Sequence, residues 1–405
     1  MAAEQIVAAL DIGTTKILAL VGERDKEGEI YIIGHGQSPA EGLRRGVVVD
    51  MDKTVRSIRR AIDDAQLVSG TEIDRVTVGI SGEHVRSINS QGVIAVNRAD
   101  NEITPTEVEK VIEASRAVAI PVDREIIHVI PQDFSVDDES GIKDPTGMSG
   151  VRLEVEAHIV TASVTTTRNI YRALERCQLG VDHIVLEALG LAQILLNDEE
   201  RHSGAVIVDF GGDITSVSLF YDSAIRHTAV VSLGSRNVTN DIAIGLRTSL
   251  EQAEEIKLAH GACLASLVDP EEMIMVSGMG GRAGREISRN VLASVIEPRV
   301  EEIFSLVGRE LKKVHRGDTA AAGMVLTGGG SLLPGVIELA EQMFDMPVRC
   351  GQISGFAHVP DELNSIRYAT AHGLVLYGLT NESEERKQHI RGIWKKMENW
   401  ITKQF

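Results

Sequence analysis

The feature that most constrains the fold is a strand–turn–strand pattern that occurs twice in the chain. The first copy spans residues 6–21, where the sequence DIGTT separates two apolar runs. The second copy spans residues 205–220, where DFGGD separates two further apolar runs. Glycine and threonine suit the tight turn of a hairpin and its flanks. Two copies of one hairpin therefore predict a duplicated α/β fold with two lobes.

The turns of these hairpins predict a phosphate-binding site. Turn glycines allow backbone N–H groups to converge on one point, and such a group of amides binds phosphate oxygens. A third element has the same character, because an apolar strand at 324–327 runs into a triple glycine that precedes a helix. A single glycine-rich turn is usually only a turn, but three that face one cleft predict a bound nucleotide. The residues predicted to bind it are Gly13, Thr14, Thr15, Lys16, Gly211, Gly212, Asp213, Gly328, Gly329 and Gly330.

An acidic residue follows the first strand of each hairpin, Asp11 in one copy and Asp209 in the other. A hydrated Mg²⁺ ion binds through a few carboxylates together with phosphate oxygens. The two acids are therefore predicted to hold Mg²⁺ through water, or to orient an attacking water molecule. Glu187, at the start of a predicted helix, is a third catalytic candidate near the terminal phosphate. A solvated carboxylate at a helix N-terminus explains Glu187 equally well.

The remaining periodicity predicts the other elements. Apolar spacing indicates a strand at 75–81 and an inserted subdomain over about 84–160. The segment 380–388, TNESEERKQ, contains no apolar residue and is predicted to be a flexible linker. Helices are predicted at 55–68, 106–118, 170–178, 186–196, 249–258, 287–313 and 334–344.

Charge and cysteine content exclude several classes of protein. The formal net charge of −18 argues against nucleic-acid binding, which requires a basic surface. Three widely separated cysteines predict neither a zinc site nor a disulfide framework and fit a reducing cytoplasm. No apolar run approaches the ~20 residues that a transmembrane helix requires. Any membrane contact is therefore expected to be peripheral.

The last residues, 389–405, have the pattern of an amphipathic helix. Apolar residues recur at spacings of three and four, whereas basic residues lie largely off that face. Such a helix behind a polar linker fits an anchor on anionic lipids, and docking on the protein's own core is the alternative. The predicted membrane-facing residues are Ile390, Ile393, Trp394, Lys395, Met397, Trp400, Ile401 and Phe405.

Several segments resemble known families. The order DIGTTK, DFGGDIT, LTGGGSLLPG resembles the actin, Hsp70 and sugar-kinase superfamily. Within it, the chain is similar over essentially its whole length to the FtsA family of bacterial cell-division proteins. The segments that carry this resemblance are GISGEHV (79–85), HVIPQDFSVD (128–137), GIKDPTGMSGVRLE (141–154), NVTNDIA (237–243), AEEIK (253–257) and VIEPRVEEI (295–303).

The resemblance implies an actin-like α/β fold with ribonuclease H-like duplicated lobes, an inserted subdomain 1C and a C-terminal amphipathic helix. It implies the following divisions: subdomain 1A at 1–83, 164–194 and 355–379; 1C at 84–163; 2A at 195–236 and 306–354; 2B at 237–305; the linker at 380–388; and the membrane helix at 389–405.

The resemblance also implies function. ATP with Mg²⁺ would bind between the lobes, with Glu254 and Lys257 in contact with adenosine. The protein would assemble with itself into actin-like filaments and bind the C-terminal tail of FtsZ through Arg299 and Glu302. Anionic lipids would be a further partner, and subdomain 1C a surface for other division proteins. The expected place is the cytoplasmic face of the bacterial inner membrane at the division septum.

The chain departs from the family pattern in its second turn. Asp213 and Ile214 stand where many relatives have glycine and threonine, and Ser216 replaces a frequent aspartate. The Asp213 carboxylate could repel phosphates or turn outward into solvent, so hydrolysis is expected to be slow at most. Enzymes of the same fold are the alternative, but no sugar-kinase base or chaperone substrate domain is identifiable. A pilus-assembly relative is a further alternative, against which the amphipathic tail counts.

Overall fold

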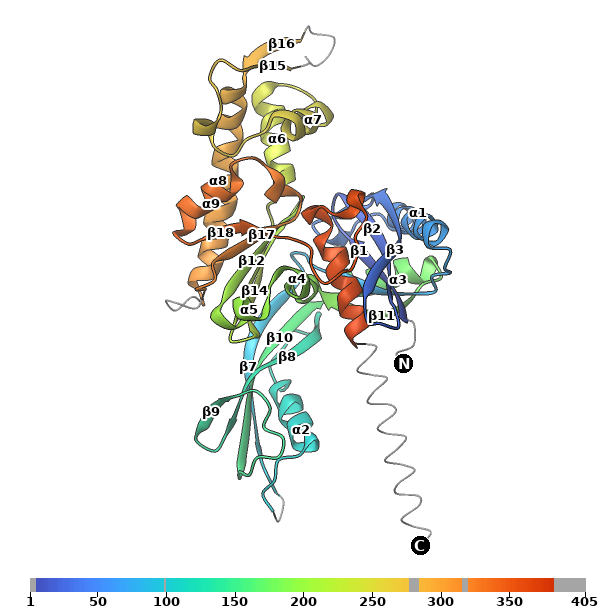
Figure 1. Cartoon of the computed structure of the whole chain (residues 1–405), viewed down its shortest axis with the longest axis vertical. Coiled ribbons are helices and arrows are strands. Elements are labelled where there is room, and N and C mark those ends of the chain that lie inside the picture. The colour runs from blue at the N-terminus through green and yellow to red at the C-terminus, as the bar shows by residue number, and fades with distance from the viewer. Residues whose placement is uncertain (1–4, 98–99, 277–283, 315–319, 382–405) are drawn as a thin grey trace.

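The two predicted hairpins each begin a five-stranded sheet in the computed structural model, which describes residues 5–97, 100–276, 284–314 and 320–381. The first sheet has the order β11-β6-β1-β2-β3 and the second has the order β14-β13-β12-β17-β18. In both, a three-stranded antiparallel meander continues into two parallel strands. The predicted duplication of an α/β lobe is confirmed (Figure 1).

The strands of the two sheets correspond one to one. The first sheet consists of β1 (Gln5–Ile12), β2 (Lys16–Arg24), β3 (Ile30–Pro39), β6 (Arg75–Ile80) and β11 (Gly180–Leu186). The second consists of β12 (Ala205–Phe210), β13 (Thr215–Tyr221), β14 (Ala224–Val231), β17 (Met324–Thr327) and β18 (Val348–Cys350). Asp11 lies opposite Leu18 in the first hairpin, and Asp209 lies opposite Ser216 in the second.

Helices cover the first sheet because their apolar faces match it. In α1 (Met51–Ser69) the buried positions fall at helical spacing, and the Asp50 side chain caps the first turn. Gly70, in the left-handed conformation, ends this helix. The other helices of this lobe are α3 (Val164–Arg176), α4 (Glu187–Leu195) and a helix over 369–381.

The second lobe carries a helical extension. The helices α8 (Arg289–Lys312) and α9 (Val336–Phe344) pack with its sheet, and α6 (Ser235–Leu246) and α7 (Leu250–His260) lie beyond them with the ribbon β15–β16. The ribbon strands are β15 (Met273–Val276) and β16 (Arg285–Ser288). A short helix, α5 (Asp198–Ser203), precedes β12, and β4 (Leu43–Arg44) pairs with β5 (Val47–Val48) in the first lobe.

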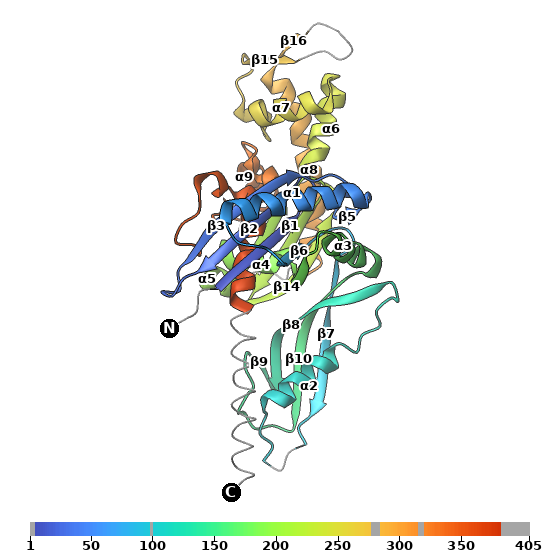
Figure 2. The same ribbon diagram turned by 90° about the vertical axis from the view of Figure 1, so that its right-hand side faces the viewer.

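The predicted insertion is a separate sheet with its own core. It consists of β7 (Arg86–Ala95), β8 (Arg124–Val136), β9 (Glu139–Ile142), β10 (Arg152–Ser163) and α2 (Pro105–Ser115). Its buried cluster, which includes Ile103 and Phe134, is distinct from those of the two lobes. Figures 1 and 2 show this sheet at the end of the long axis opposite the ribbon β15–β16.

The predicted helices exist, but their ends differ: the predicted helix at 170–178 spans Val164–Arg176, and the predicted helix at 55–68 spans Met51–Ser69. The predicted helix at 106–118 ends at Ser115. The predicted helix at 287–313 starts two residues late, because Ile287 pairs with Ile274 in the ribbon. The predicted linker at 380–388 is wrong for its first two residues, since 380 and 381 belong to the last described helix and their side chains bond to carbonyls four residues back.

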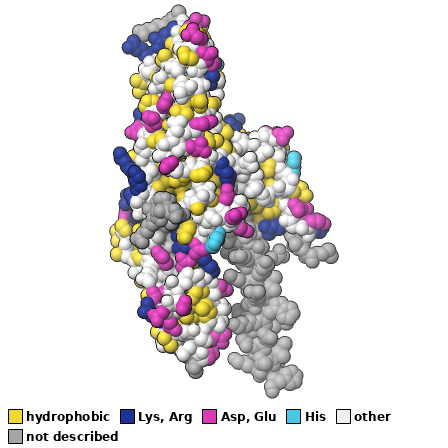
Figure 3. All heavy atoms as spheres, turned by 60° about the vertical axis from the view of Figure 1, so that its left-hand side comes forward, with side chains coloured by type: hydrophobic (Ala, Val, Ile, Leu, Met, Phe, Trp, Pro, Cys, Tyr) yellow, Lys and Arg dark blue, Asp and Glu magenta, His cyan; other side chains and the backbone are white. Residues whose placement is uncertain are grey.

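Acidic side chains are spread along the molecule, in keeping with the formal net charge of −18. On the face shown in Figure 3, Asp and Glu side chains occur on the lobes and on the inserted sheet. No helix among residues 5–97, 100–276, 284–314 and 320–381 combines the length and apolar character needed to cross a bilayer.

Candidate functional site

The two hairpin turns and the glycine turn meet at one cavity between the lobes, with a volume of about 520 Å³. Residues 13–16 line it from the first lobe, and Gly211 and Gly212 line it from the second. The third turn, Gly328–Gly330, enters from the end of β17 and continues as a short 3₁₀ helix. Three elements distant in sequence therefore converge, as the repeated turns predicted.

Glycine is required where these turns approach one another. A Cβ atom on Gly212 would collide with Thr15 Cγ2 of the opposite lobe. A Cβ atom on Gly328, whose φ is 82°, would collide with Asp209 Oδ1. The second turn is thus pressed against the first, and the third against the acid at the end of β12.

Three acids gather in this cavity, namely Asp11, Glu187 and Asp209. Burial raises the pKa of Asp209 to about 6, with a further contribution from Asp11, while Lys16 acts in the opposite direction. Burial also raises the pKa of Asp11, and burial followed by the charges of Asp11 and Asp209 raises that of Glu187 well above its usual value. Buried carboxylates that are clustered in this way attract a cation.

The acids suit a metal ion that is bound partly by a ligand and by water. Among the described residues, no group of three or more His, Cys, Asp or Glu side chains is arranged to hold a metal by itself. A hydrated Mg²⁺ ion requires only one or two carboxylates when phosphate oxygens supply the rest. Asp11 and Asp209 fit that requirement, and both line the cavity.

Glu254 and Lys257 line the same cavity from α7. Lys257 is buried, and its Nζ atom lies 2.7 Å from Glu254 Oε2 and donates to Thr239 Oγ1 at 2.9 Å. These contacts hold both side chains in place on the wall away from the acids. Lys16 is held differently, since its Nζ atom donates to the carbonyl of Arg367 at 2.7 Å.

Several lining residues carried no signal in the sequence. Five such residues reach the cavity from β3, from the residue after β6, from the start of α6 and from the last described segment, namely Gln37, Ser81, Ser235, Arg367 and Thr370. None lies in a glycine turn or follows an acid at a strand end. Only the packing of distant elements brings them to the site.

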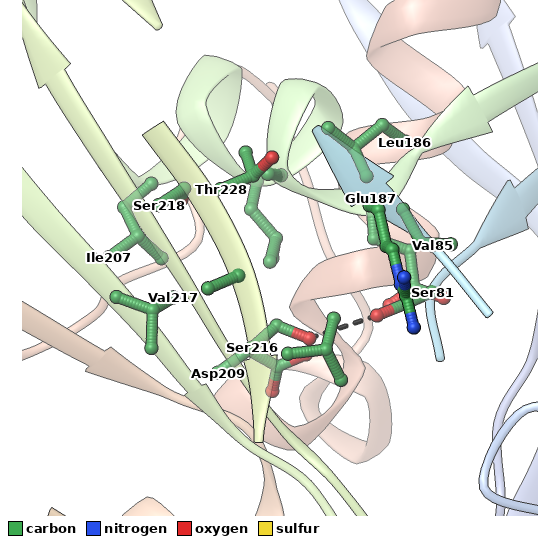
Figure 4. A pocket seen from close by; sticks show the side chains of 15 residues that line it. Ser81, Val85, Leu186, Glu187, Ile207, Asp209, Ser216, Val217, Ser218 and Thr228 are labelled. Atoms are coloured by element: carbon green, nitrogen blue, oxygen red, sulfur yellow. Dashed lines mark hydrogen bonds between the residues drawn. The ribbon is translucent and has the colours of Figure 1, made fainter. Parts of the chain in front are cut away.

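Ser81 also closes the back of the cavity. Its hydroxyl lies 2.9 Å from that of Ser216 on the opposite lobe. Figure 4 shows this hydrogen bond beside Asp209, in a smaller chamber that Glu187 also lines. Ser216, which stands where the family resemblance leads us to expect aspartate, therefore supplies a neutral hydrogen bond between the lobes.

Asp213 is the exception among the predicted nucleotide contacts, because it does not belong to the cavity lining. The proposed outward turn into solvent is wrong, since the residue is only 8% exposed. Its carboxylate lies 3.1 Å from Arg236 Nη1 and accepts a hydrogen bond from the backbone N–H of Arg45. A tertiary ion pair, which no local pattern encodes, decided its orientation.

Arg299 and Glu302 lie together on α8, away from the cavity. Arg299 forms an ion pair with Glu302 and a second with Asp241 of α6, in which Nη2 donates to Asp241 Oδ1 at 3.1 Å. Asp241 was not predicted to take part. The predicted membrane-facing residues, from Ile390 to Phe405, lie outside the described residues.

Comparisons with known proteins agree with this architecture. The family model described as cell division protein FtsA matches residues 206–373, and the model described as the SHS2 domain inserted in FTSA matches residues 82–161. The chain is 44% identical to cell division protein FtsA of Pseudomonas aeruginosa over 96% of this chain and 93% of that protein. It is 38% identical to cell division protein FtsA of Neisseria meningitidis over 99% of both chains.

Solved structures support the fold alone. The chain matches a PilM–PilN type IV pilus biogenesis complex with a TM-score of 0.64 at 16% identity, covering 92% of this chain and 98% of that one. It matches MreB5 of Spiroplasma citri bound to AMPPNP with a TM-score of 0.59 at 12% identity, covering 95% and 99%. The predicted actin-like α/β fold with an inserted domain is confirmed.

Proposed function

The chain belongs to the FtsA family of cell-division proteins, and from this premise we propose that it binds ATP, polymerises on the cytoplasmic membrane and tethers FtsZ filaments there. One observation carries the nucleotide part of the proposal. Two matched turns from opposite lobes and a third glycine turn converge on a single cavity that also contains the acids Asp11, Glu187 and Asp209. Backbone amides of such turns suit phosphates, and the acids suit the accompanying Mg²⁺.

In this proposal each wall of the cavity has a separate task. Gly13–Lys16 and Gly211–Gly212 hold the phosphates, and Gly328–Gly330 together with Glu254 and Lys257 hold the adenosine. Asp11 and Asp209 hold the hydrated Mg²⁺, and Glu187 orients a water molecule near the terminal phosphate. Hydrolysis is slow at most, so the nucleotide mainly sets the arrangement of the lobes.

Calorimetry tests the nucleotide site. Titration of Mg-ATP into the full chain is expected to show one site per chain, and excess EDTA is expected to weaken binding. Absence of measurable binding at millimolar Mg-ATP contradicts the proposal. A turnover assay with candidate small-molecule acceptors separates it from the kinase alternative, because brisk acceptor phosphorylation indicates a metabolic enzyme.

We propose that the FtsZ tail binds beside Arg299 and Glu302. Arg299 presents a guanidinium that is already oriented by Asp241, and Arg side chains pair well with the carboxylates of an acidic peptide. The change Arg299→Ala is expected to weaken binding of an FtsZ C-terminal peptide about tenfold in fluorescence anisotropy. Arg309→Ala, an exposed basic position on the same helix, is the matched control and is expected to leave the affinity unchanged.

We propose that residues 389–405 form a peripheral membrane anchor. A buried large apolar side chain contributes roughly 1.5–3 kcal/mol, so a single tail binds reversibly, and a polymer gains avidity. Truncation after Gln388 is expected to abolish pelleting with anionic liposomes and to leave nucleotide affinity intact. Trp400→Glu is expected to have a milder effect. Continued pelleting of the truncated protein refutes the anchor.

The inserted sheet, proposed to span 84–163, is a candidate surface for other division proteins. It is rooted in the first lobe and contacts the second through β14. Ser87 Oγ donates to the carbonyl of Thr228, and Gln132 Nε2 donates to that of Ile225. Pull-down of division proteins with a chain whose insertion is replaced by that of a distant relative tests this assignment.

A further inference from the structure

The two phosphate turns are joined directly by a cluster of polar contacts centred on Asp213. The backbone N–H of Asp213 donates to Thr14 Oγ1 at 3.2 Å, which links the second turn to the first. Arg236, at the start of α6, donates through Nη2 to the carbonyl of Thr14 at 3.2 Å. The same guanidinium pairs with Asp213, whose other carboxylate oxygen accepts from the Arg45 backbone N–H at 3.3 Å. Asp213 and Arg236 from one lobe thus hold Thr14 and Arg45 of the other.

These contacts need no nucleotide. Every donor and acceptor in the cluster belongs to the chain, and the carboxylate faces away from the cavity. The Asp213 side chain is 9% exposed, whereas the Arg236 side chain is 47% exposed. A half-buried, charged hydrogen-bonded pair contributes more than a fully exposed one. Glycine at position 213 would supply the backbone contact alone.

A second space lies beside the cluster and shares lining residues with the cavity. A neighbouring space of about 350 Å³ is lined by Arg236 and Thr239, and it shares Thr15, Ser235, Glu254 and Lys257 with the nucleotide cavity. Arg236 therefore borders a space next to the nucleotide cavity while it contacts Thr14 of the opposite lobe.

We propose that Asp213 and Arg236 form a latch that keeps the phosphate turns together whether or not nucleotide is present, and that thereby slows the release of nucleotide. The proposal rests on the proposed ATP site. In this role the two side chains are positioning residues, because they act on the phosphates only through Thr14 and the second turn. Asp213 departs from the family pattern, but Arg236 neutralises its charge, and the pair helps to hold the two lobes together.

Stopped-flow release of a fluorescent ATP analogue tests the latch. Asp213→Asn keeps the shape and the acceptor for Arg45 but removes the ion pair, and Arg236→Gln removes the contact with Thr14. Each single change is expected to raise the dissociation rate roughly tenfold, and the double variant about as much as one single change, because both disrupt one unit. Arg176→Ala, which breaks a 2.7 Å ion pair with Asp52 inside the first lobe, is expected to leave the rate unchanged.

Hydrogen–deuterium exchange without nucleotide separates this proposal from the proposed function. Both latch variants are expected to speed exchange in residues 13–16 and 211–214, with thermal melting as a check that they fold. Rates of release within twofold of the unaltered chain, or unchanged exchange of both turns, overturn the latch. Failure of the unaltered chain to bind the analogue overturns the ATP site instead, and the exchange experiment then still decides whether the latch exists.

Discussion

The first and second phosphate turns share one backbone plan but differ in charge. Each follows a strand that ends in an acid and precedes an antiparallel partner strand. The first turn leads into Lys16, which lines the cavity and whose positive charge acts on the acids. The second turn carries Asp213, which points out of the cavity to Arg236. The duplicated fold thus supplies two equivalent turns for the proposed phosphate site, and their side chains differ in charge and direction.

This division explains how an acid is tolerated beside a phosphate site. A carboxylate near a triphosphate is unfavourable unless a cation offsets it. For Asp213 the cation is Arg236 of α6, and this contact also holds the lobes together. For Asp11, Glu187 and Asp209 the cation is Lys16. The first turn is therefore expected to contribute most to nucleotide affinity, and the second to contribute most to holding the two lobes together.

Removal of the lysine is expected to have the largest effect. Lys16→Ala leaves Asp11, Glu187 and Asp209 without the cation that opposes their charge, so they repel the phosphates. We expect a loss of roughly 100-fold in Mg-ATP affinity by calorimetry. Lys313→Ala, which removes an exposed lysine paired with Glu310, is the control. An Mg-ATP affinity within threefold of the unaltered chain would contradict the proposal that the first turn contributes most to nucleotide affinity.

A methyl group on the second turn tests their close approach. Gly212→Ala places a Cβ against Thr15 Cγ2 of the opposite lobe, so either the Thr15 side chain or the lobes must shift. The expected loss of Mg-ATP affinity is about 30-fold, and the free energy of unfolding without nucleotide is expected to fall. Gly329→Ala is the matched control for stability, because its Cβ would meet no atom within 4 Å. Equal melting temperatures for the two variants would contradict the tight contact.

The pH dependence of Mg²⁺ sharpens the role of the acid that precedes the second turn. The pKa of Asp209 is about 6, so its carboxylate is mostly ionised at pH 7.5 and mostly protonated at pH 5.5. Because only the ionised carboxylate attracts Mg²⁺, Mg-ATP affinity is expected to fall about fourfold as the pH is lowered from 7.5 to 5.5. Asp209→Asn is expected to bind more weakly at pH 7.5 and to lose this dependence. A dependence that persists in the variant must arise from another group.

The hydrogen bond behind the cavity is expected to have the smallest effect. Ser81→Ala removes one neutral bond to Ser216, so nucleotide affinity is expected to fall about threefold. Ser354→Ala, which removes a single serine bond to the Ile194 carbonyl at a position that does not line the cavity, is the comparison. A loss of nucleotide affinity as large as that for Lys16→Ala would mean that the bond between Ser81 and Ser216 contributes as much to nucleotide affinity as the turns do.

The parts of the fold that depend on local pattern were predictable. The hairpins, the glycine turn and helices such as α1 carry their signal in apolar spacing, caps and turn residues. The start of α8 was misplaced, because Ile287 pairs with a strand more than ten residues earlier. Helical propensity cannot reveal such a pairing.

The contacts of charged residues were not predictable in the same way. Asp213 meets Arg236 from another element, and Arg299 meets Asp241 on a neighbouring helix. No period or motif relates these positions, so only tertiary packing shows which charges meet. Asp11 and Asp209 were identifiable because each lies at the end of the first strand of a repeated hairpin, whereas Gln37 and Ser235 reach the cavity without such a signal.

The most direct measurement is the structure of the full chain with Mg-AMPPNP. The account predicts a triphosphate within hydrogen-bonding distance of backbone amides from both residues 13–16 and residues 211–212, and a hydrated ion beside Asp11 and Asp209. A nucleotide held by one lobe alone, or a cavity without nucleotide at saturating concentration, would contradict it.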